Sequence, residues 1–182
     1  MEAWRCTMGD VWRKAVVDSF KYLPRSFRER YAQVAPPDEP IPWTPLRVPL
    51  HEACIALVTT AGIWRKDLDP PFDYEREKRE PTWGDPSYRV IPRDTRQEQI
   101  GAGHLHINND DLLADVNVVL PIHRAEELER TGEIGALAPS AYSFMGFQGS
   151  PANLQPWRDV YGPEVAARMR AEGVDAVLLT PV

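Results

Sequence analysis

The apolar residues follow different spacings in the two parts of the chain. In residues 8–33 they return every three or four positions, which predicts an amphipathic helical region. Pro24 lies within it, and because a proline there removes a backbone hydrogen bond, we expect two helices or one kinked helix. Six prolines in residues 35–49 then predict an extended strap. We therefore divide the chain into an N-terminal helical extension with a proline-rich strap, residues 1–49, and a main α/β domain, residues 50–182.

Three runs of apolar and β-branched residues predict the strands of the main domain. They lack strict alternation, which is typical of strands buried on both faces. Helical segments with glycine stops lie between them, and this alternation predicts an α/β fold with a three-layer, open, mostly parallel sheet and helices on both faces. The expected neighbouring strands are residues 55–60, 116–120 and 175–181.

Two further segments of the main domain carry specific expectations. The helix expected at residues 163–172 should lie on the sheet through Val165, Ala166 and Met169, which share one helical stripe. The long, charged, proline-rich loop after the first strand is a candidate wall for a site. Residues 142–146, between a proline and glycine-rich turns, are interpreted as a loop with an aromatic wall.

Composition excludes several classes of protein. A net charge of -6 disfavours nucleic acid as a partner. No apolar run approaches the ~20 residues that cross a bilayer, and the first residues lack a secretory signal, so we expect no membrane partner and a cytoplasmic location. Cys6 and Cys54 lie far apart without a paired spacing, so neither a zinc site nor a disulfide framework is indicated, and we expect no cofactor bound in this chain.

Several segments, taken in order, resemble the selenoprotein B family of glycine, betaine, sarcosine and D-proline reductases. The resemblance runs from about Ala56 to Val182 and leaves the extension and strap outside it. It is carried by ALVTTAG with the following DPPFD, GDPSYRVIP, HLHINNDD, DVNVVLPI, GEIGALAPSAYSFMG and GVDAVLLTPV.

The resemblance implies a redox residue that this chain does not contain. In the family a selenocysteine or cysteine directly follows the strand equivalent to VDAVLLTPV, so selenocysteine is expected after Val182 in the full-length product. We interpret the end point as a UGA codon read as stop. In the reductases the selenolate attacks a substrate carbon activated by a pyruvoyl-bearing partner and displaces the amine. The implied partners are a small-molecule substrate and a protein redox partner, and an uncovered carboxyl end predicts association into a homo-oligomer.

Candidate substrate-binding residues gather at strand ends and turns. Thr59 and Thr60 follow the first strand, where open α/β sheets place ligands, although the segment is equally a tight strand exit. Asp85, Ser87 and Arg89 form a turn in which the guanidinium offers a fork for a carboxylate, or is simply solvated or paired with an acid.

Three more residues complete the proposed substrate contacts. Tyr142 and Ser143 offer hydroxyls, whereas their neighbours Phe144 and Met145 are explained by packing. Asn108 lies in a segment that also reads as a plain turn.

The two histidines of HLHINNDD support two different hypotheses. His106 is the candidate acid or base that contacts substrate or orients the absent nucleophile, and it should then approach the carboxyl end of the last strand. Alternatively, His104, His106 and Asp110 are of the types that ligate a metal.

Three functions therefore compete. The first is a thiol- or selenol-dependent reductase that cleaves a small polar substrate once its redox residue is present. The second is a non-catalytic subunit or binding module that lends its pocket to a partner holding the redox group. The third is a metal-dependent enzyme that uses the HLHINNDD segment.

Overall fold

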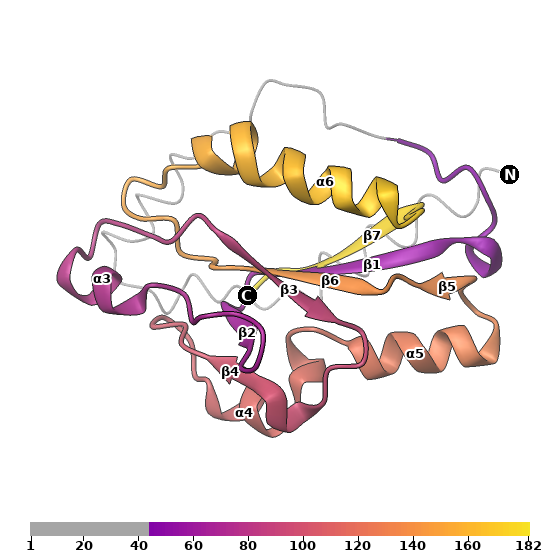
Figure 1. The fold of residues 1–182 in the computed structure, drawn as a ribbon, viewed down its shortest axis with the longest axis horizontal. Coiled ribbons are helices and arrows are strands. Elements are labelled where there is room, and N and C mark those ends of the chain that lie inside the picture. Colours follow the sequence, from indigo (N-terminus) through magenta and orange to yellow (C-terminus); the bar gives the residue numbers. More distant parts are fainter. Residues whose placement is uncertain (1–43) are drawn as a thin grey trace, which may run out of the picture. The chain divides into compact units, whose positions relative to one another are not determined.

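A computed structural model describes residues 44–182, and all of these except Thr44 belong to the unit that begins at Pro45 (Figure 1). The expected helices of residues 8–33 and most of the proline-rich strap lie outside the described residues. The described part is an α/β structure built on one mixed sheet. This confirms the α/β class, whereas the division at residue 49 and the three layers around a mostly parallel sheet stay predictions.

The sheet is organised around β1 (Cys54–Thr59). On one side, β1 pairs in parallel first with β5 (Ala136–Leu137) and then with β6 (Ser140–Phe144). On its other side it pairs in parallel with β7 (Ala176–Thr180) along five residues. β3 (Tyr88–Pro92) runs antiparallel to β6, which makes the sheet mixed. The expected pairing of the first and last strands is therefore confirmed.

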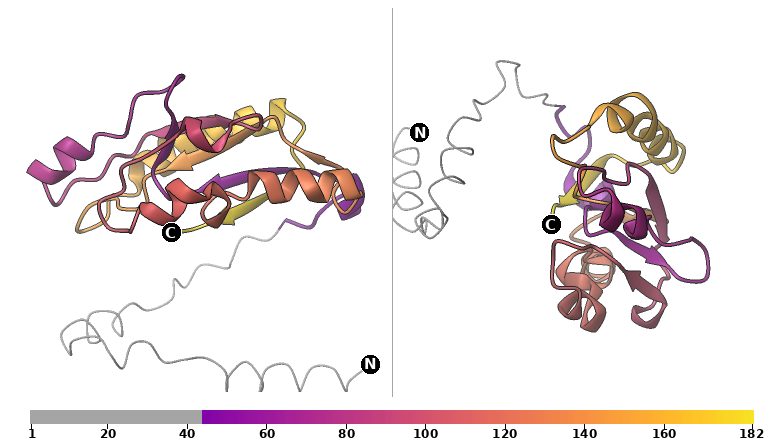
Figure 2. Two further views of the ribbon diagram at one scale, coloured as in Figure 1. Left: turned by 90° about the horizontal axis from the view of Figure 1, so that it is seen from below. Right: turned by 90° about the vertical axis from the view of Figure 1, so that its left-hand side faces the viewer.

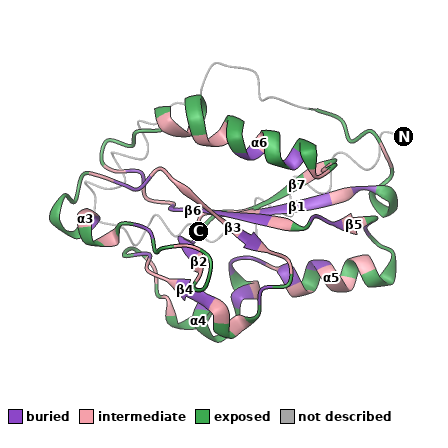
Figure 3. Ribbon diagram, in the orientation of Figure 1, coloured by how far each residue is buried: buried purple, intermediate pink, exposed green. Residues whose placement is uncertain are grey.

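One long helix packs on each face of the sheet, and Figures 1 and 2 both show α6 and α5 on opposite sides of it. α6 (Gly162–Ala171) ends before Gly173, and α5 (Ile122–Thr131) ends at Gly132; both glycines adopt a positive φ. Successive β1 residues point to opposite faces. On one face, Ala56 packs with Val165 and Met169 of α6, as expected, and Ala166 is half-buried. On the other face, Leu57 packs in the cluster that holds Ile122 and Ala125 of α5. Figure 3 shows the buried residues along both helices.

Shorter elements complete the described part. β2 (Ile63–Arg65) and β4 (Ile100–Ala102) form a separate antiparallel pair. The short helices are α3 (Tyr74–Arg79) and α4 (Asp110–Ala114), with 3₁₀ turns at Leu50–Glu52, Gln97–Gln99 and Val116–Val118 and a π-helical turn at Trp157–Tyr161. None of the described helices has the length and apolar character needed to cross a bilayer.

The strand predicted at residues 116–120 is wrong. Val116–Val118 form a 3₁₀ turn that leads into α5. The Asp115 carboxylate accepts hydrogen bonds from the Asn117 backbone N–H and side-chain amide, at 3.0 and 2.7 Å. Gln97 Oε1 accepts the Val116 N–H. These side chains satisfy backbone groups that a sheet would otherwise pair, so local polar contacts override the β-branched composition.

The loop predicted at residues 142–146 is also wrong in its first half. Tyr142–Phe144 belong to β6, which pairs with β1 on one side and with β3 on the other. Pro139 and Gly146 suggested a loop, but they stand outside the paired residues. A strand with two neighbours and both faces covered is stabilised by tertiary contacts that flanking residues do not reveal.

The outer strand β7 presents an apolar surface. It pairs with β1 alone among the described residues. Val177, Leu178 and Leu179 are all exposed, Leu179 by 65%. This is the uncovered strand that the sequence led us to expect, and the association it should cause stays a prediction.

Candidate functional site

The carboxyl ends of β1 and β7 are tied together by threonine hydroxyls. Thr60 Oγ1 accepts a hydrogen bond from the Val182 N–H at 2.8 Å and donates to Val182 O at 3.3 Å. Thr59 Oγ1 donates to Thr180 O at 3.2 Å and accepts the Ala61 N–H. Thr59 is fully buried and thus fastens the two strands, while Thr60 stands at the edge where parallel sheets place ligands.

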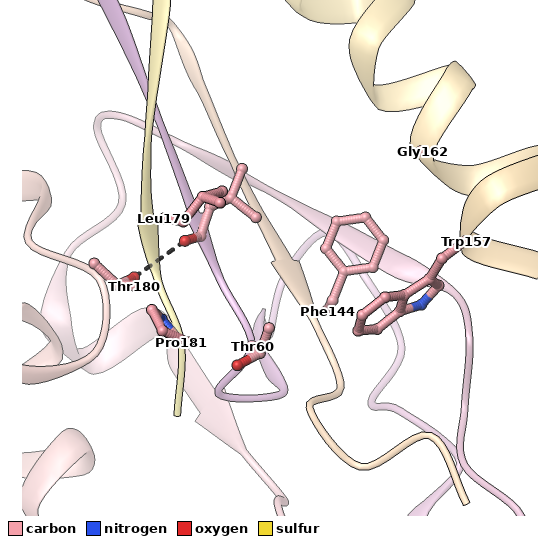
Figure 4. A pocket seen from close by; sticks show the side chains of 8 residues that line it. Thr60, Phe144, Trp157, Gly162, Leu179, Thr180 and Pro181 are labelled. Carbon is pink, nitrogen blue, oxygen red and sulfur yellow. Dashed lines mark hydrogen bonds between the residues drawn. The ribbon is translucent and has the colours of Figure 1, made fainter. Parts of the chain in front are cut away.

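Two hollows flank the end of β7. The first, on the α6 side, has a volume of about 400 Å³ and apolar walls that include Phe144, Trp157 and Leu179, with Thr60 at its rim (Figure 4). The second, on the α4 side, has a volume of about 430 Å³ and is lined by Asn108 and Val182 among others. Each is large enough for a small metabolite.

The ring of His104 reaches the carboxyl ends of β1 and β7. Its side chain is 3% exposed, and its Nδ1 accepts the backbone N–H of His106 at 3.1 Å. The ring proton is therefore assigned to Nε2, which is buried and has no hydrogen-bond partner. A Cβ built on Gly146 would lie 3.3 Å from this Nε2 and 3.0 Å from the carbonyl oxygens of both Thr60 and Val182. Four segments thus converge at Gly146.

Burial controls the charge of this histidine. It lowers the pKa of His104 below its usual value, and the nearby His106 lowers that pKa further. The neutral imidazole, a donor at Nε2 and an acceptor at Nδ1, is the form that the fold holds near neutral pH.

His106 has a different environment. Its side chain is half exposed, its Nε2 lies 2.8 Å from Glu77 Oε1, and its ring stacks on Phe147 at 4.3 Å between centroids. The ring centroids of His104 and His106 are 5.8 Å apart. Glu77 is 3% exposed, so this pair fixes α3 against the HLHINN segment. The acid or base role assigned to His106 stays a prediction.

Asp85, Ser87 and Arg89 come together as the sequence suggested, but they bind their own loop. Asp85 accepts the N–H groups of Asp73 and Ser87, both at 2.9 Å. Arg89 donates to the carbonyl oxygens of Pro70 and Pro71 and stacks on the ring of Phe72 at 4.2 Å. The cluster therefore holds the expected wall in place, and its substrate contacts stay predictions.

The remaining candidates are placed as follows. Tyr142 is fully buried among the residues under α6, and its hydroxyl has no partner. Ser143 is equally buried and accepts the Ile63 N–H at 3.0 Å. Asn108 Oδ1 accepts the Asp110 N–H, the turn contact that was the plain interpretation, although Asn108 also lines the second hollow.

The metal hypothesis gains no support from the described residues. Within residues 44–182, no three side chains of the histidine, cysteine, aspartate or glutamate types are grouped to hold a metal ion. His104 and His106 use ring nitrogens on a backbone N–H and on Glu77, respectively.

The sequence reasoning missed two features of the site. Trp157, whose Nε1 donates to Pro86 O at 3.0 Å, forms a wall of the first hollow, and a bulky aromatic just before the α6 helix was the available signal. Gly146 was expected only as part of a loop, and the structure shows that the absence of a side chain there leaves room for His104 beside the strand ends.

Comparison with known proteins defines the class. The family model for glycine/sarcosine/betaine reductase selenoprotein B matches residues 30–182, so the chain belongs to this family. The match begins before Ala56 and includes the proline-rich strap, which the sequence analysis had placed outside the resemblance.

Individual relatives agree with the family. The chain is 38% identical over 152 residues to D-proline reductase subunit gamma of Acetoanaerobium sticklandii, covering 84% of this chain and 57% of the relative. It is 30% identical to glycine reductase complex component B subunit gamma of Carboxydothermus hydrogenoformans and 31% identical to that of Symbiobacterium thermophilum; each match covers 77% of this chain, and 30% and 31% of those relatives, respectively. The chain thus spans from about a third to somewhat over half of these proteins. No solved structure matches.

Proposed function

We propose that the chain forms the substrate-binding part of a selenoprotein B-type reductase subunit, which cleaves a carbon–heteroatom bond in a small polar molecule. The observation that carries the proposal is the convergence of Thr60, His104 and the end of β7 between two hollows. A nucleophile placed directly after Val182 would stand at this point. The similarity to D-proline reductase favours a cyclic or linear amino acid as substrate.

Cys54 is unsuited to serve as that nucleophile. It lies at the amino end of β1, and burial, followed by the charge of Asp175, raises the pKa of its thiol. A raised pKa leaves little thiolate, which is the reactive form. We assign the redox residue of the proposed reaction to a selenocysteine or cysteine that follows Val182, which is the position that the family resemblance implies.

The proposed reaction conserves atoms and electrons as follows. The selenolate or thiolate forms a bond to the substrate carbon while the carbon–nitrogen bond breaks, and the electron pair leaves with nitrogen, which takes up a proton. One thiolate of a dithiol on the redox partner then attacks the selenium or sulfur; the bond from that atom to carbon breaks, and carbon keeps the electron pair and takes up a proton. The second thiol of the pair displaces the selenolate or thiolate, which leaves a disulfide on the partner and releases the proton that nitrogen takes up. A hollow with apolar walls, such as the one in Figure 4, excludes water from such a step.

The first experiment concerns the residue after Val182. The gene should continue with a UGA or cysteine codon, and mass spectrometry of the full-length product treated with iodoacetamide should find that residue alkylated. A different codon, or a product with no alkylated residue there, refutes the proposal.

A second function is favoured by the similar proteins, which are subunits of reductases. In this alternative the chain lends its pocket to a partner that holds the reactive thiol. Affinity purification of the full-length product from its own cell distinguishes the two. A stoichiometric partner with an alkylatable thiol, together with an unreactive chain, supports the alternative; a reactive full-length chain supports the first proposal.

A further inference from the structure

The Nε2–H of His104 is a buried donor without an acceptor. Buried polar groups in folded proteins are almost always hydrogen-bonded, because desolvation without a new partner is costly. The orphaned Nε2 of His104 is therefore a feature that needs a reason. It is also held in place, since Nδ1 accepts the His106 N–H at 3.1 Å and Asn109 Nδ2 donates to the His104 carbonyl at 3.0 Å.

The surroundings of this donor are specific. Around Gly146, the Thr60 and Val182 carbonyl oxygens approach the same point as His104 Nε2. Carbonyl oxygens carry partial negative charge and disfavour an anion beside them. His104 Nε2 lies 3.3 Å from the position that a Gly146 Cβ would take, so its N–H is a donor beside this point, and a hydrogen-bond donor favours negative charge near it.

We propose that His104 is a catalytic residue whose Nε2–H donates a hydrogen bond to the thiolate or selenolate placed at the end of β7. The inference rests on the proposed function, since it requires a redox residue directly after Val182. It assigns the role expected of His106 to its buried neighbour instead. The neutral ring that burial maintains is suited to this, because it keeps one donor fixed at Nε2 while Nδ1 stays an acceptor.

Two substitutions separate this role from a structural one. In His104→Asn, the side-chain oxygen can replace Nδ1 as the acceptor of the His106 N–H, but the distal donor is lost. In His104→Gln, the amide reaches the position of Nε2 and can donate there, but the proximal acceptor is lost. A merely structural histidine would tolerate Asn better than Gln, whereas a donor to the nucleophile would tolerate Gln better than Asn. His123→Asn serves as a control because His123, on α5, contacts Asn117 of the 116–118 turn and lies outside the candidate site.

The measurement is the rate of alkylation by iodoacetamide at pH 7 of the full-length product in its cysteine form. We expect His104→Asn to slow alkylation about tenfold, as a rise of one unit in the thiol pKa would, and His104→Gln and His123→Asn to stay within about twofold. Circular dichroism confirms that each variant is folded. An unchanged rate in His104→Asn, or equal loss in His104→Gln, overturns the inference but leaves the proposed function intact.

Nuclear magnetic resonance of the full-length product in its cysteine form gives an independent readout. The imidazole nitrogen shifts should show the His104 proton on Nε2. A proton on Nδ1 would overturn the inference whatever follows Val182. Absence of any alkylated residue after Val182 would instead overturn both proposals.

Discussion

The amino and carboxyl ends of β1 are built from different kinds of contact. At the amino end, the Cys54 N–H donates to Asp175 at 2.9 Å, and Arg93 pairs with Glu129 while donating to Leu137 O at 2.8 Å. At the carboxyl end, His104 keeps a buried donor unpaired and hollows open on both sides of β7. The amino end is closed by these contacts, although Glu172 Oε2 near Cys54 is also buried without a partner, whereas the carboxyl end opens into two hollows. The difference indicates that the amino end stabilises the fold and the carboxyl end binds.

Alanine at Gly135 tests the amino end with the largest expected effect. A Cβ there would lie 2.3 Å from the Glu52 carbonyl carbon and 2.8 Å from the Ala53 nitrogen, both backbone atoms that cannot rotate away. We expect Gly135→Ala to lower the free energy of unfolding by about 3 kcal/mol. Urea unfolding followed by circular dichroism measures it. A loss under 1 kcal/mol would mean that this end is looser than the contacts indicate.

The Arg93–Glu129 pair should have the next largest effect. Glu129 also accepts the Leu137 N–H at 3.1 Å, so Glu129→Ala leaves two donors without their acceptor. Because both side chains are about one-third exposed, we expect a loss of about 2 kcal/mol, less than for a fully buried pair. The matched control is Glu127→Ala, which removes an exposed pair with Arg124 and should cost less than about 0.5 kcal/mol. Equal losses would contradict the comparison.

Acid should weaken the two ends in separate pH ranges. The pKa of His104 is lowered from 6.5, so as pH falls below 6.5 the unfolded chain gains a proton that the folded chain resists, and stability falls. The pKa of Glu129 is lowered from 4.5 chiefly by its bond to Arg93, so its stabilisation is complete above 4.5 and is lost as pH falls through the folded-state value. Urea unfolding from pH 7.5 to 3.5 should show a weaker upper slope in His104→Asn and a weaker lower slope in Glu129→Gln. The same slopes in wild type and variants would refute this assignment.

Alanine at Gly146 should have a smaller effect on stability than the substitutions at Gly135 and Glu129. Its Cβ would meet the Thr60 and Val182 oxygens at 3.0 Å, so a small shift suffices, and we expect a cost of about 1 kcal/mol. The same change should displace His104, 3.3 Å away, and alter its imidazole resonances. An unaltered His104 signal would show that the ring does not sense this junction.

Much of the fold was readable because its signals are local or repeated. The helices of α5 and α6 follow from apolar spacing and a glycine stop, and β1 and β7 from continuous apolar runs. The 116–120 segment shows where this fails. Its β-branched residues favour a strand, but the polar contacts of Asp115 and Gln97 that decide its conformation involve a residue 19 positions away.

The candidate site was predicted only in outline. Thr60 lies at the expected edge of the sheet because the carboxyl ends of parallel strands all lie at the same edge. The sequence could not show which of His104 and His106 reaches the strand ends, because the two histidines are separated by a single residue. That depends on which ring Glu77 and Phe147 draw toward the surface, and on the space above Gly146, which no local pattern encodes.

The turn at Val116–Val118 also affects how the chain reaches its fold. The run VNVVL has the high β-propensity and low charge of segments that form intermolecular strands, and Val118 remains 62% exposed after folding. Before the Asp115 hydrogen bonds form this turn, both this run and strand β7 expose apolar residues that can pair with another chain. Asp115 is thus a charged residue at the edge of an apolar, β-prone run, the placement that disfavours intermolecular strand pairing, and this consequence is separate from any chemistry at the site.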